Sequence, residues 1–189
     1  MSEVREQLEI LAQTLVQKSG LHELSFRQLA EHTGIKSSSV HYYFPEKKDL
    51  TAALIKTYSQ AFAARLQAID EAETTLRRKV MAFVDLFAEA AADDKLCLCG
   101  MLAAELSSLD DDCRMLLEGF FRDAERWLAN LLKHHKDELA TPLPAGKLAA
   151  VVMSGLEGAL LLDRVHGSGA HLHAQRQLVT SFIAIRRSA

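Results

Sequence analysis

The sequence has few of the residues that interrupt helices and few that favour strands. Three prolines and nine glycines occur in 189 residues, and aromatic side chains make up 6% of the chain. Proline and glycine are the strongest breakers of a helix, so their scarcity favours long helices. No run of alternating β-branched residues indicates a strand. With 49% hydrophobic residues the chain can bury a core, and we expect an all-α protein of about nine helices.

The sequence also lacks signals for export or membrane insertion. Charged residues interrupt every apolar run before it reaches the roughly 18–20 residues that span a bilayer. The N-terminal segment MSEVREQLEI lacks the basic and apolar regions of a signal peptide. Three cysteines, an odd number, do not make a disulfide framework. These absences predict a cytoplasmic protein with no membrane partner.

Motifs for catalysis and for metal binding are missing as well. The chain has no Gly-rich phosphate loop, no His-Glu-x-x-His, no Gly-x-Ser-x-Gly and no paired-carboxylate motif of the di-iron type. His171 and His173 are two residues apart, so on a helix they point in different directions, and no cysteine or carboxylate completes a metal site at known spacing. We therefore expect neither an enzyme nor a protein with a cofactor or metal.

Residues 25–50, SFRQLAEHTGIKSSSVHYYFPEKKDL, have the pattern of two short helices joined by a tight turn. Ser25 is placed to cap the first helix, and Gln28 three residues later completes a capping box. Gly34 supplies the backbone freedom that a sharp turn requires. A second helix of about two turns is expected over residues 37–43. Helix, glycine turn and short polar helix are typical of a helix-turn-helix, whose second helix enters the major groove of DNA.

The expected second helix has an apolar inner side and a polar outer side. Val40 and Phe44 face inward, and the outer positions carry small or hydrogen-bonding groups. Lys36, Lys47 and Lys48 stand at the two ends, within reach of phosphates. The alternative from periodicity alone is a solvated two-turn helix in an ordinary helical bundle.

The residues of this segment resemble the motif that closes the DNA-binding domain of the tetracycline-repressor (TetR) family. Its characteristic glycine, aliphatic, aromatic or histidine, lysine and leucine positions are matched by Gly34, Val40, His41, Tyr42, Tyr43, Phe44, Lys47 and Leu50. The resemblance extends over about residues 4–55 and includes Phe26–Ala30 as the family's second helix. Beyond it only the layout of helices is similar.

The resemblance implies a homodimeric transcriptional repressor that binds a palindromic DNA operator and is released by a small-molecule effector. It divides the chain into a DNA-binding domain, residues 1–48, and a ligand-binding and dimerisation domain, residues 49–189. The implied DNA-binding residues are Lys36, Ser37, Ser38, Ser39, His41, Tyr42, Tyr43 and Lys47. The tyrosines and Lys47 are expected to hold phosphates and the serines to meet bases, with His41 at a base edge or a phosphate.

Two features depart from the family pattern. The family often has Lys or Arg and Gly or Thr where the three serines stand, so the operator sequence cannot be inferred. Glu46 replaces the usual Ser-like cap before Lys47, and we expect it to weaken the nearby phosphate contact. The charge is also unusual: residues 1–50 hold six Lys and Arg against seven Asp and Glu, whereas a DNA-binding domain usually has a basic footprint.

A first helix is expected over residues 3–19, with Val4, Leu8, Leu11 and Leu15 on one face. After the helix-turn-helix, the chain is expected to form six further helices. These are residues 46–71, 75–92, 98–107, 110–136, 145–166 and 171–187. The segment 148–162 is apolar nearly all round and must be buried on several sides. Gly155, Gly158 and Ala159 allow another helix to approach it. The resemblance implies that the last two helices, with Ile185 on the apolar stripe, form a dimer interface; the alternative is that they only close the core of one chain.

An effector cavity is implied only by the resemblance. The candidate wall residues are Met81, Val84, Phe87, Met101, Glu105, Phe120, Phe121, Trp127 and Met153. Each Met or Phe taken alone is more typical of core packing. Glu105 and Trp127 are of more interest, because a carboxylate or an indole N–H in apolar surroundings requires a partner, which a ligand or the protein itself could supply.

Cys97 and Cys99 lie where the helix over residues 98–107 should begin. A helix N-terminus favours the thiolate, so these cysteines could react with oxidants or electrophiles. This gives an alternative function, a cysteine-based electrophile sensor without an inducible cavity, beside that of a helical small-molecule-binding protein. The opposing interpretation is two small buried apolar residues, with Cys113 as a possible neighbour.

Overall fold

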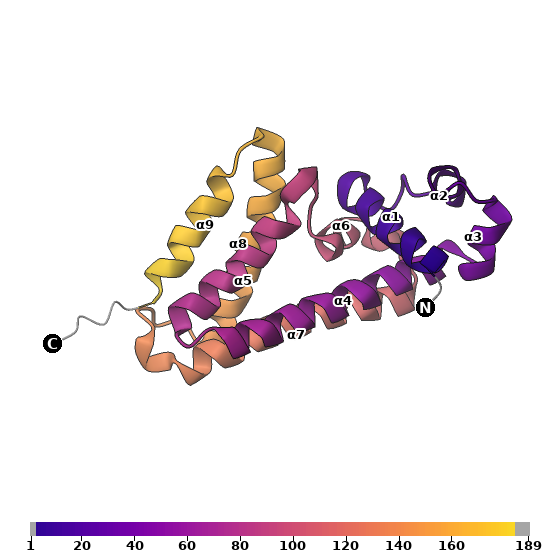
Figure 1. The fold of residues 1–189 in the computed structure, drawn as a ribbon. Coiled ribbons are helices and arrows are strands. Elements are labelled where there is room, and N and C mark those ends of the chain that lie inside the picture. The colour runs from indigo at the N-terminus through magenta and orange to yellow at the C-terminus, as the bar shows by residue number, and fades with distance from the viewer. Residues whose placement is uncertain (1–2, 184–189) are drawn as a thin grey trace. The chain divides into compact units, whose positions relative to one another are not determined.

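The computed structural model describes residues 3–183, and nine α-helices make up most of this part of the chain (Figure 1). Among the described residues no strand occurs, and the one isolated β-bridge pairs Leu139 with Ile183. The prediction of an all-α fold is therefore confirmed. The chain divides into two compact units. Unit 1 contains the chain up to Ala61 together with Lys95–Phe120, and unit 2 contains Phe62–Asp94 and the chain from Phe121 onward.

Unit 1 contains the first three helices of the chain, of which the second and third are short. In unit 1, α1 packs against both α2 and α6, and α2 packs against α3 (Figure 1). Its elements are α1 (Glu3–Ser19), α2 (Phe26–Thr33), α3 (Ser37–Tyr43), the first part of α4 (Lys47–Ala72), α6 (Leu98–Ala104), the 3-10 turn η2 (Leu106–Ser108) and the first part of α7 (Asp111–His134). The expected helix over residues 98–107 is thus shorter, because its last turn tightens into the separate 3-10 turn.

The ends of α2 show the expected cap at Ser25 and the expected turn at Gly34, but among the described residues the Gln28 side chain makes no returning bond that would complete a capping box. Ser25 Oγ accepts a hydrogen bond from the backbone N–H of Gln28 at 3.2 Å. Gly34 ends the helix in the left-handed region, with φ 70° and ψ 20°, and its N–H bonds to the carbonyl of Ala30. Only glycine adopts this conformation at low cost, so the sharp turn between α2 and α3 depends on the residue at position 34.

The start of α4 has a cap that the sequence analysis did not identify. Glu46, the residue before the helix, supplies no Ser-like cap, but its own backbone N–H donates to Asp49 Oδ2 at 2.8 Å. This is the returning half of a capping box, in which the third helical residue bonds back to the N-cap amide. The Asp49 side chain thus caps the start of α4 in place of the missing Ser-like cap at position 46.

The buried face of α1 differs from the stripe of Val4, Leu8, Leu11 and Leu15 that its periodicity suggests. Leu8, Ala12 and Val16, spaced by four residues, are fully buried, whereas the other three predicted positions are only partly covered. Glu9 is also buried, at 5% exposure. It accepts hydrogen bonds from Arg5 Nε at 3.0 Å and from Thr57 Oγ1 at 3.1 Å. One of the acidic residues of the N-terminal region is therefore paired inside the fold.

The helix α3 is held in place by two buried side chains. Val40 is fully buried and Phe44, directly after the helix, is 1% exposed. The guanidinium of Arg5 lies over the ring of Phe44 at 5.1 Å from its centroid. The predicted division of α3 into an inner apolar and an outer polar side is therefore confirmed.

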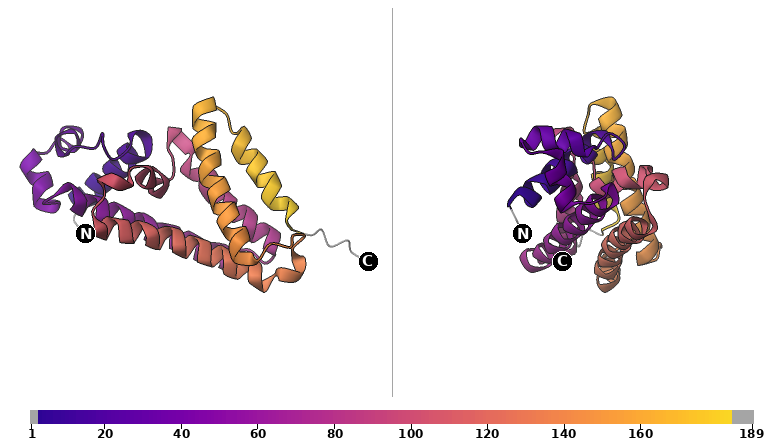
Figure 2. Two further views of the ribbon diagram at one scale, coloured as in Figure 1. Left: turned by 180° about the vertical axis from the view of Figure 1, so that it is seen from behind. Right: turned by 90° about the vertical axis from the view of Figure 1, so that its right-hand side faces the viewer.

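Unit 2 contains a helical hairpin and the helix that packs against it. Antiparallel α8 and α9 lie side by side, and α5 contacts both (Figures 1 and 2). Its elements are the rest of α4, α5 (Leu76–Ala90), the 3-10 turn η1 (Ala92–Asp94), the rest of α7, the 3-10 turn η3 (Lys136–Glu138), α8 (Ala145–His166) and α9 (Ala170–Ser181). The last helix was expected to reach residue 187 but ends at Ser181; residues 184–187, including Ile185, lie outside the described part.

One carboxylate organises the turn between α8 and α9. Asp163 accepts hydrogen bonds from the backbone N–H groups of His171 and Leu172 at 2.8 and 2.9 Å. It also accepts one from His171 Nδ1 at 2.9 Å. Gly167 ends α8 with a φ of 62°. The side chain of His171 is thus used within the fold, at the point where the sequence suggested a histidine pair.

Four aromatic rings cluster in unit 2. Phe83 stacks on Trp127, with ring centroids 5.5 Å apart and planes inclined by 15°. The ring of Phe83 also contacts those of Phe87 and Phe62, with centroids 5.5 and 6.2 Å apart. Such contacts add about 0.5–1.5 kcal/mol each beyond the burial of apolar area.

Replacing Phe44 by Ala is expected to lower the free energy of unfolding by about 3–5 kcal/mol, because it removes a buried ring next to α3. The control is Tyr42→Ala, since the Tyr42 side chain is 81% exposed and should change stability by less than about 0.5 kcal/mol. Urea unfolding followed by circular dichroism measures both. Equal effects of the two changes would contradict this account of what holds α3.

Candidate nucleic-acid interface

The eight predicted DNA-binding residues all lie on α3 or directly beside it. Tyr42 is 81% exposed, and Ser39 and Tyr43 are half-buried. The other exposed members are Lys36, Ser37, Ser38, His41 and Lys47. The fold therefore presents a short polar surface, which we call the α3 surface, made of these eight residues. A role in binding DNA stays a prediction for each of them.

The α3 surface carries groups suited to a groove of DNA. Three hydroxyls occupy its first turn, where a recognition helix meets base edges. Tyr42 and Tyr43 pack edge to face, with centroids 5.2 Å apart. Hydroxyl groups of this kind donate to phosphate oxygens. The surface therefore combines hydroxyl donors suited to phosphates with the small polar groups of the three serines.

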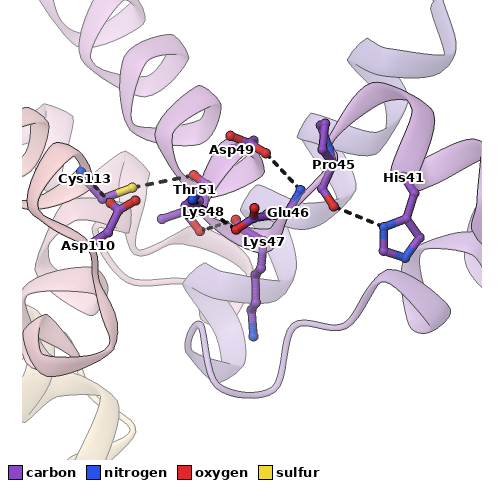
Figure 3. A network of polar contacts seen from close by, with 9 residues as sticks. All are labelled: His41, Pro45, Glu46, Lys47, Lys48, Asp49, Thr51, Asp110 and Cys113. Atoms are coloured by element: carbon purple, nitrogen blue, oxygen red, sulfur yellow. Dashed lines mark hydrogen bonds and ion pairs between the residues drawn. The ribbon is translucent and has the colours of Figure 1, made fainter.

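Two lysines follow α3 in different electrostatic settings (Figure 3). Lys48 Nζ pairs with Glu46 Oε2 at 3.0 Å, and this hydrogen bond raises the pKa of Lys48. Partial burial lowers the pKa of Lys47, although the carboxylates of Glu105 and Glu23 act against that change. The salt bridge of Glu46 is thus with Lys48, whereas we expected Glu46 to affect the contact made by Lys47.

Arg27 is a basic residue that the sequence analysis did not select. It lies in the first turn of α2, and its side chain is 87% exposed. Its Nε forms an ion pair with Glu31 Oε1 at 2.9 Å. Exposed ion pairs of this kind contribute little to stability, so the guanidinium could exchange this partner for a phosphate or a base. The sequence signal that could have identified Arg27 is its position, a basic residue at the start of the first helix of the helix-turn-helix.

Glu105 has its hydrogen-bond partners within unit 1. Its carboxylate accepts from the backbone N–H of Leu21 at 2.7 Å and of His22 at 2.9 Å. These amides follow Gly20, which ends α1 with a φ of 89°. A Cβ at position 20 would collide with the Glu105 side chain. The partner that we sought for this carboxylate in a ligand is therefore the backbone between α1 and α2.

A second polar contact joins α1 to the segment before α6. Gln17 Nε2 donates to the carbonyl of Leu96 at 2.9 Å, and the N–H of Leu96 donates to the carbonyl of Gln17 at 3.1 Å. The Gln17 side chain is buried at 4% exposure. Buried hydrogen bonds are costly to break. Together with Glu105, this pair ties the segment Leu96–Glu105 to α1 at one end and to the connection between α1 and α2 at the other.

The cysteines are buried. Cys97 and Cys99 are 2% and 0% exposed, and Tyr58 Oη donates to Cys97 Sγ at 3.7 Å. Burial, together with the nearby Asp110 carboxylate, raises the pKa of Cys113 to about 12. Its Sγ lies 3.6 Å from the carbonyl of Lys48 (Figure 3). A reagent has little access to these thiols in the folded protein, which favours their interpretation as small core residues; redox activity stays an untested hypothesis.

The predicted effector residues are distributed over both units. Met101, Glu105 and Phe120 belong to unit 1, and Met81, Val84, Phe87, Trp127 and Met153 belong to unit 2, as does Phe121. Val84, Phe87 and Met153 are buried core residues. Met81 differs, because it lines a groove of about 700 Å³ between α5 and α9, together with Arg77, Ala140, Arg176, Gln177, Thr180, Ser181 and Ile183.

The indole N–H of Trp127 also has a partner within its own unit. Trp127 Nε1 donates to Asp70 Oδ2 at 2.8 Å, and Lys79 Nζ donates to Asp70 Oδ1 at 2.7 Å. Burial raises the pKa of Asp70, but these two hydrogen bonds outweigh that effect and lower it overall. The two polar groups that we singled out as ligand-binding candidates are therefore both satisfied by the protein.

Replacing Glu105 by Gln should lower the free energy of unfolding by about 1–3 kcal/mol, because an amide oxygen accepts more weakly than a carboxylate and its NH2 group faces two N–H donors. Glu23→Gln makes the same change of charge at an exposed carboxylate in the same region and is the control. Thermal unfolding of both variants provides the measurement. If Glu23→Gln lowered the free energy of unfolding as much as Glu105→Gln, the hydrogen bonds of Glu105 would not be the cause.

Comparison with known proteins relates both parts of the chain to one group of regulators. The family model "Bacterial regulatory proteins, tetR family" matches residues 11–54, which include α2 and α3. The model "Transcriptional regulator LmrA/YxaF-like, C-terminal domain" matches residues 77–177, more than half of the chain.

Individual relatives agree with these matches. The chain is 26% identical over 166 residues to the HTH-type transcriptional regulator of the lacX 3′ region of Lactococcus lactis, covering 85% of this chain and 83% of the relative. It is 27% identical over 163 residues to the transcriptional regulator AcuR of Cereibacter sphaeroides, covering 83% and 74%.

A solved structure extends the similarity to the fold. The crystal structure of a TetR transcriptional regulator from Legionella pneumophila matches with a TM-score of 0.88 and 29% identity, covering 97% of this chain and 98% of that one. The two family models, the relatives and this structure all lead to the same conclusion: the chain belongs to the TetR family of bacterial transcriptional regulators, which are DNA-binding proteins and not enzymes.

Proposed function

We propose that this protein is a homodimeric repressor that binds a palindromic operator and leaves it when a small-molecule effector binds. In this proposal residues 1–48 contact DNA, and residues 49–189 hold the effector and the dimer interface. The observation that carries this proposal is the α3 surface. It lies on a short helix whose opposite side is buried through Val40. The cytoplasm, where operator DNA is found, is the proposed location.

The proposed contacts follow from the chemistry of the α3 surface. The three serines and His41 meet base edges, and Tyr42, Tyr43 and Lys47 hold phosphates. Only a few phosphate contacts per subunit are available, since Lys48 is paired with Glu46. Two subunits on half-sites about 34 Å apart double the number of contacts and give the affinity that one α3 cannot.

Lys47→Ala should weaken operator binding by at least about tenfold and lower the slope of log K against log salt by about two, since each phosphate contact contributes about 0.9 and a dimer has two. Tyr43→Ala should weaken binding with a smaller change of slope. Operators are first obtained by enrichment of genomic DNA, and affinities are then measured by fluorescence anisotropy over a range of salt.

The matched control for Lys47→Ala is Lys133→Ala, which removes the same charge from an exposed position near the end of α7. It should leave the salt slope unchanged. An unchanged affinity and slope in Lys47→Ala would remove this residue from the interface.

Exposed apolar residues on α8 and α9 support the proposed dimer. Val165 is 79% exposed, Leu161 53% and Leu162 47%. Leu178 on α9 is 45% exposed. By length and composition α8 could also cross a membrane, and 39% of its apolar window is buried within the chain. We propose that a second copy of the chain covers these exposed apolar side chains, because large exposed apolar patches usually mark an interface.

Small residues along α8 fit the same proposal. Gly155 lies against α9, because a Cβ there would collide with the side chain of Gln175. Gly158 faces open space, where a Cβ would meet no atom within 4 Å. One glycine thus permits the hairpin within the chain, and the other leaves room for a helix of the partner.

Val165→Asp is expected to convert the dimer to a monomer, because an unpaired carboxylate would be buried at the two-fold interface. Met115→Asp introduces the same group at another exposed apolar position, 62% exposed on α7, and should leave the dimer intact. Sedimentation velocity over a range of concentrations compares them. A Val165→Asp protein that remains dimeric would exclude this face.

For the effector, the groove between α5 and α9 is the proposed entry in unit 2. It combines apolar Met81 with Thr180 and two arginines, of which Arg176 is paired with Asp85 at 2.6 Å. A pocket of several hundred Å³ with a few convergent polar groups is typical of a small-molecule site. Movement of α4, which begins in unit 1 and ends in unit 2, is the proposed route of release.

At a concentration of 100 times its Kd, a compound that binds in the groove should stabilise the folded protein by about 2.7 kcal/mol. This corresponds to a rise of the unfolding temperature of about 5–11 °C for a chain of this length. A diverse metabolite library screened by thermal shift identifies such compounds. Thr180→Phe fills the groove and should abolish the shift, whereas Thr74→Phe, at an exposed position in the same unit, should preserve it. Hits unaffected by Thr180→Phe would place the effector elsewhere.

A further inference from the structure

The ring of His41 is fixed from two sides. The ring of Phe26 on α2 packs edge-on against it, with centroids 4.8 Å apart and planes inclined by 68°. On another side, His41 Nδ1 lies 3.2 Å from the carbonyl oxygen of Pro45 (Figure 3). The residue is nevertheless exposed to solvent. An exposed side chain with two such contacts is oriented before any ligand arrives.

The contact with Pro45 determines which nitrogen carries the hydrogen. A carbonyl oxygen can only accept, so the hydrogen bond requires a hydrogen on Nδ1. In the neutral imidazole the other nitrogen, Nε2, then has a free lone pair and acts as an acceptor. Within residues 3–183 no hydrogen bond to Nε2 is present. The neutral side chain of His41 therefore offers an acceptor to whatever binds the α3 surface.

A neutral acceptor distinguishes between the possible partners on DNA. Phosphate oxygens only accept hydrogen bonds, so an unprotonated Nε2 forms no hydrogen bond with the DNA backbone. In the major groove guanine presents N7 and O6 as acceptors, and thymine presents O4 and a methyl group. Cytosine N4 and adenine N6 carry the amino groups that donate there. The two alternatives left open by the sequence, base edge and phosphate, are thus no longer equivalent.

We propose that His41 is a specificity-determining residue that reads cytosine or adenine by accepting a hydrogen bond at Nε2 from the exocyclic amino group of the base. This inference rests on the proposed function, since it needs an operator in contact with α3. The carbonyl of Pro45 and the ring of Phe26 position the imidazole. His41 thereby selects against guanine and thymine at one position of each half-site.

The first experiment selects operators from a random DNA library at pH 8, above the range in which histidine usually titrates. The wild type is compared with His41→Phe, which keeps a ring beside Phe26 and removes the acceptor. The expected result is one position per half-site that prefers cytosine or adenine in the wild type and loses this preference in the variant. Guanine or thymine at that position, or identical motifs for the two proteins, would overturn the proposal.

A second experiment tests the atom itself. In one half-site the selected adenine is replaced by purine, or the selected cytosine by pyrimidin-2-one, each of which lacks only the exocyclic amino group. Wild-type affinity should fall about fivefold, the value of one hydrogen bond, and His41→Phe should show no loss. Equal losses in both proteins would mean that another residue reads the amino group.

The tautomer can be observed without DNA. Long-range ¹H–¹⁵N spectra at pH 8, with the His41 signals assigned by their absence in His41→Phe, should show the hydrogen on Nδ1. A hydrogen on Nε2 would overturn the proposal even if DNA binding is intact. A wild type that selects no motif at all would instead refute the proposed function, and the base-reading role with it.

Discussion

The conformation of α3 depends on the burial of Val40 and Phe44, because this helix has only seven residues. Isolated helices shorter than about 12–15 residues are marginal in water even with good helix formers, and α3 begins with three serines. Its conformation is therefore supplied by packing. Phe44 in turn is covered by Arg5, whose partner Glu9 also bonds Thr57 on α4. The polar face can consist of small, weakly helix-forming groups because the opposite face provides the stability.

Polar groups that look like binding sites in the sequence are largely used to hold helices together. Glu105 closes the backbone after Gly20, Trp127 bonds Asp70, and Asp163 caps α9 and binds His171. Each satisfies a buried or half-buried donor that would otherwise destabilise the fold. The surfaces that we propose for binding other molecules are the α3 surface, the exposed apolar residues of α8 and α9, and the groove beside Met81.

Residues 1–50 have no net positive charge, and several of their charged side chains pair with one another. Glu9 is buried and paired with Arg5, so it contributes little to the field at the surface. Glu46 neutralises Lys48, which leaves Lys47 and Lys36 as lysines beside α3. In the proposed function, such a surface relies on hydroxyl groups, on the imidazole of His41 and on two copies per operator as well as on phosphate attraction.

The amino-acid sequence by itself determined the order and type of the helices, the cap at Ser25 and the turn at Gly34, because these follow from local periodicity and capping. The helix-turn-helix was indicated by the resemblance of residues 4–55 to a known family, since periodicity alone also allowed an ordinary helical bundle. Only the tertiary structure decided the partners. It showed that Leu8, Ala12 and Val16 form the buried face of α1, that Glu105 bonds the α1–α2 connection, and that Nδ1 of His41 is occupied by Pro45. Contacts such as that between Glu105 and Leu21 join residues far apart in the chain, and a local pattern carries no information about which distant group a side chain will meet.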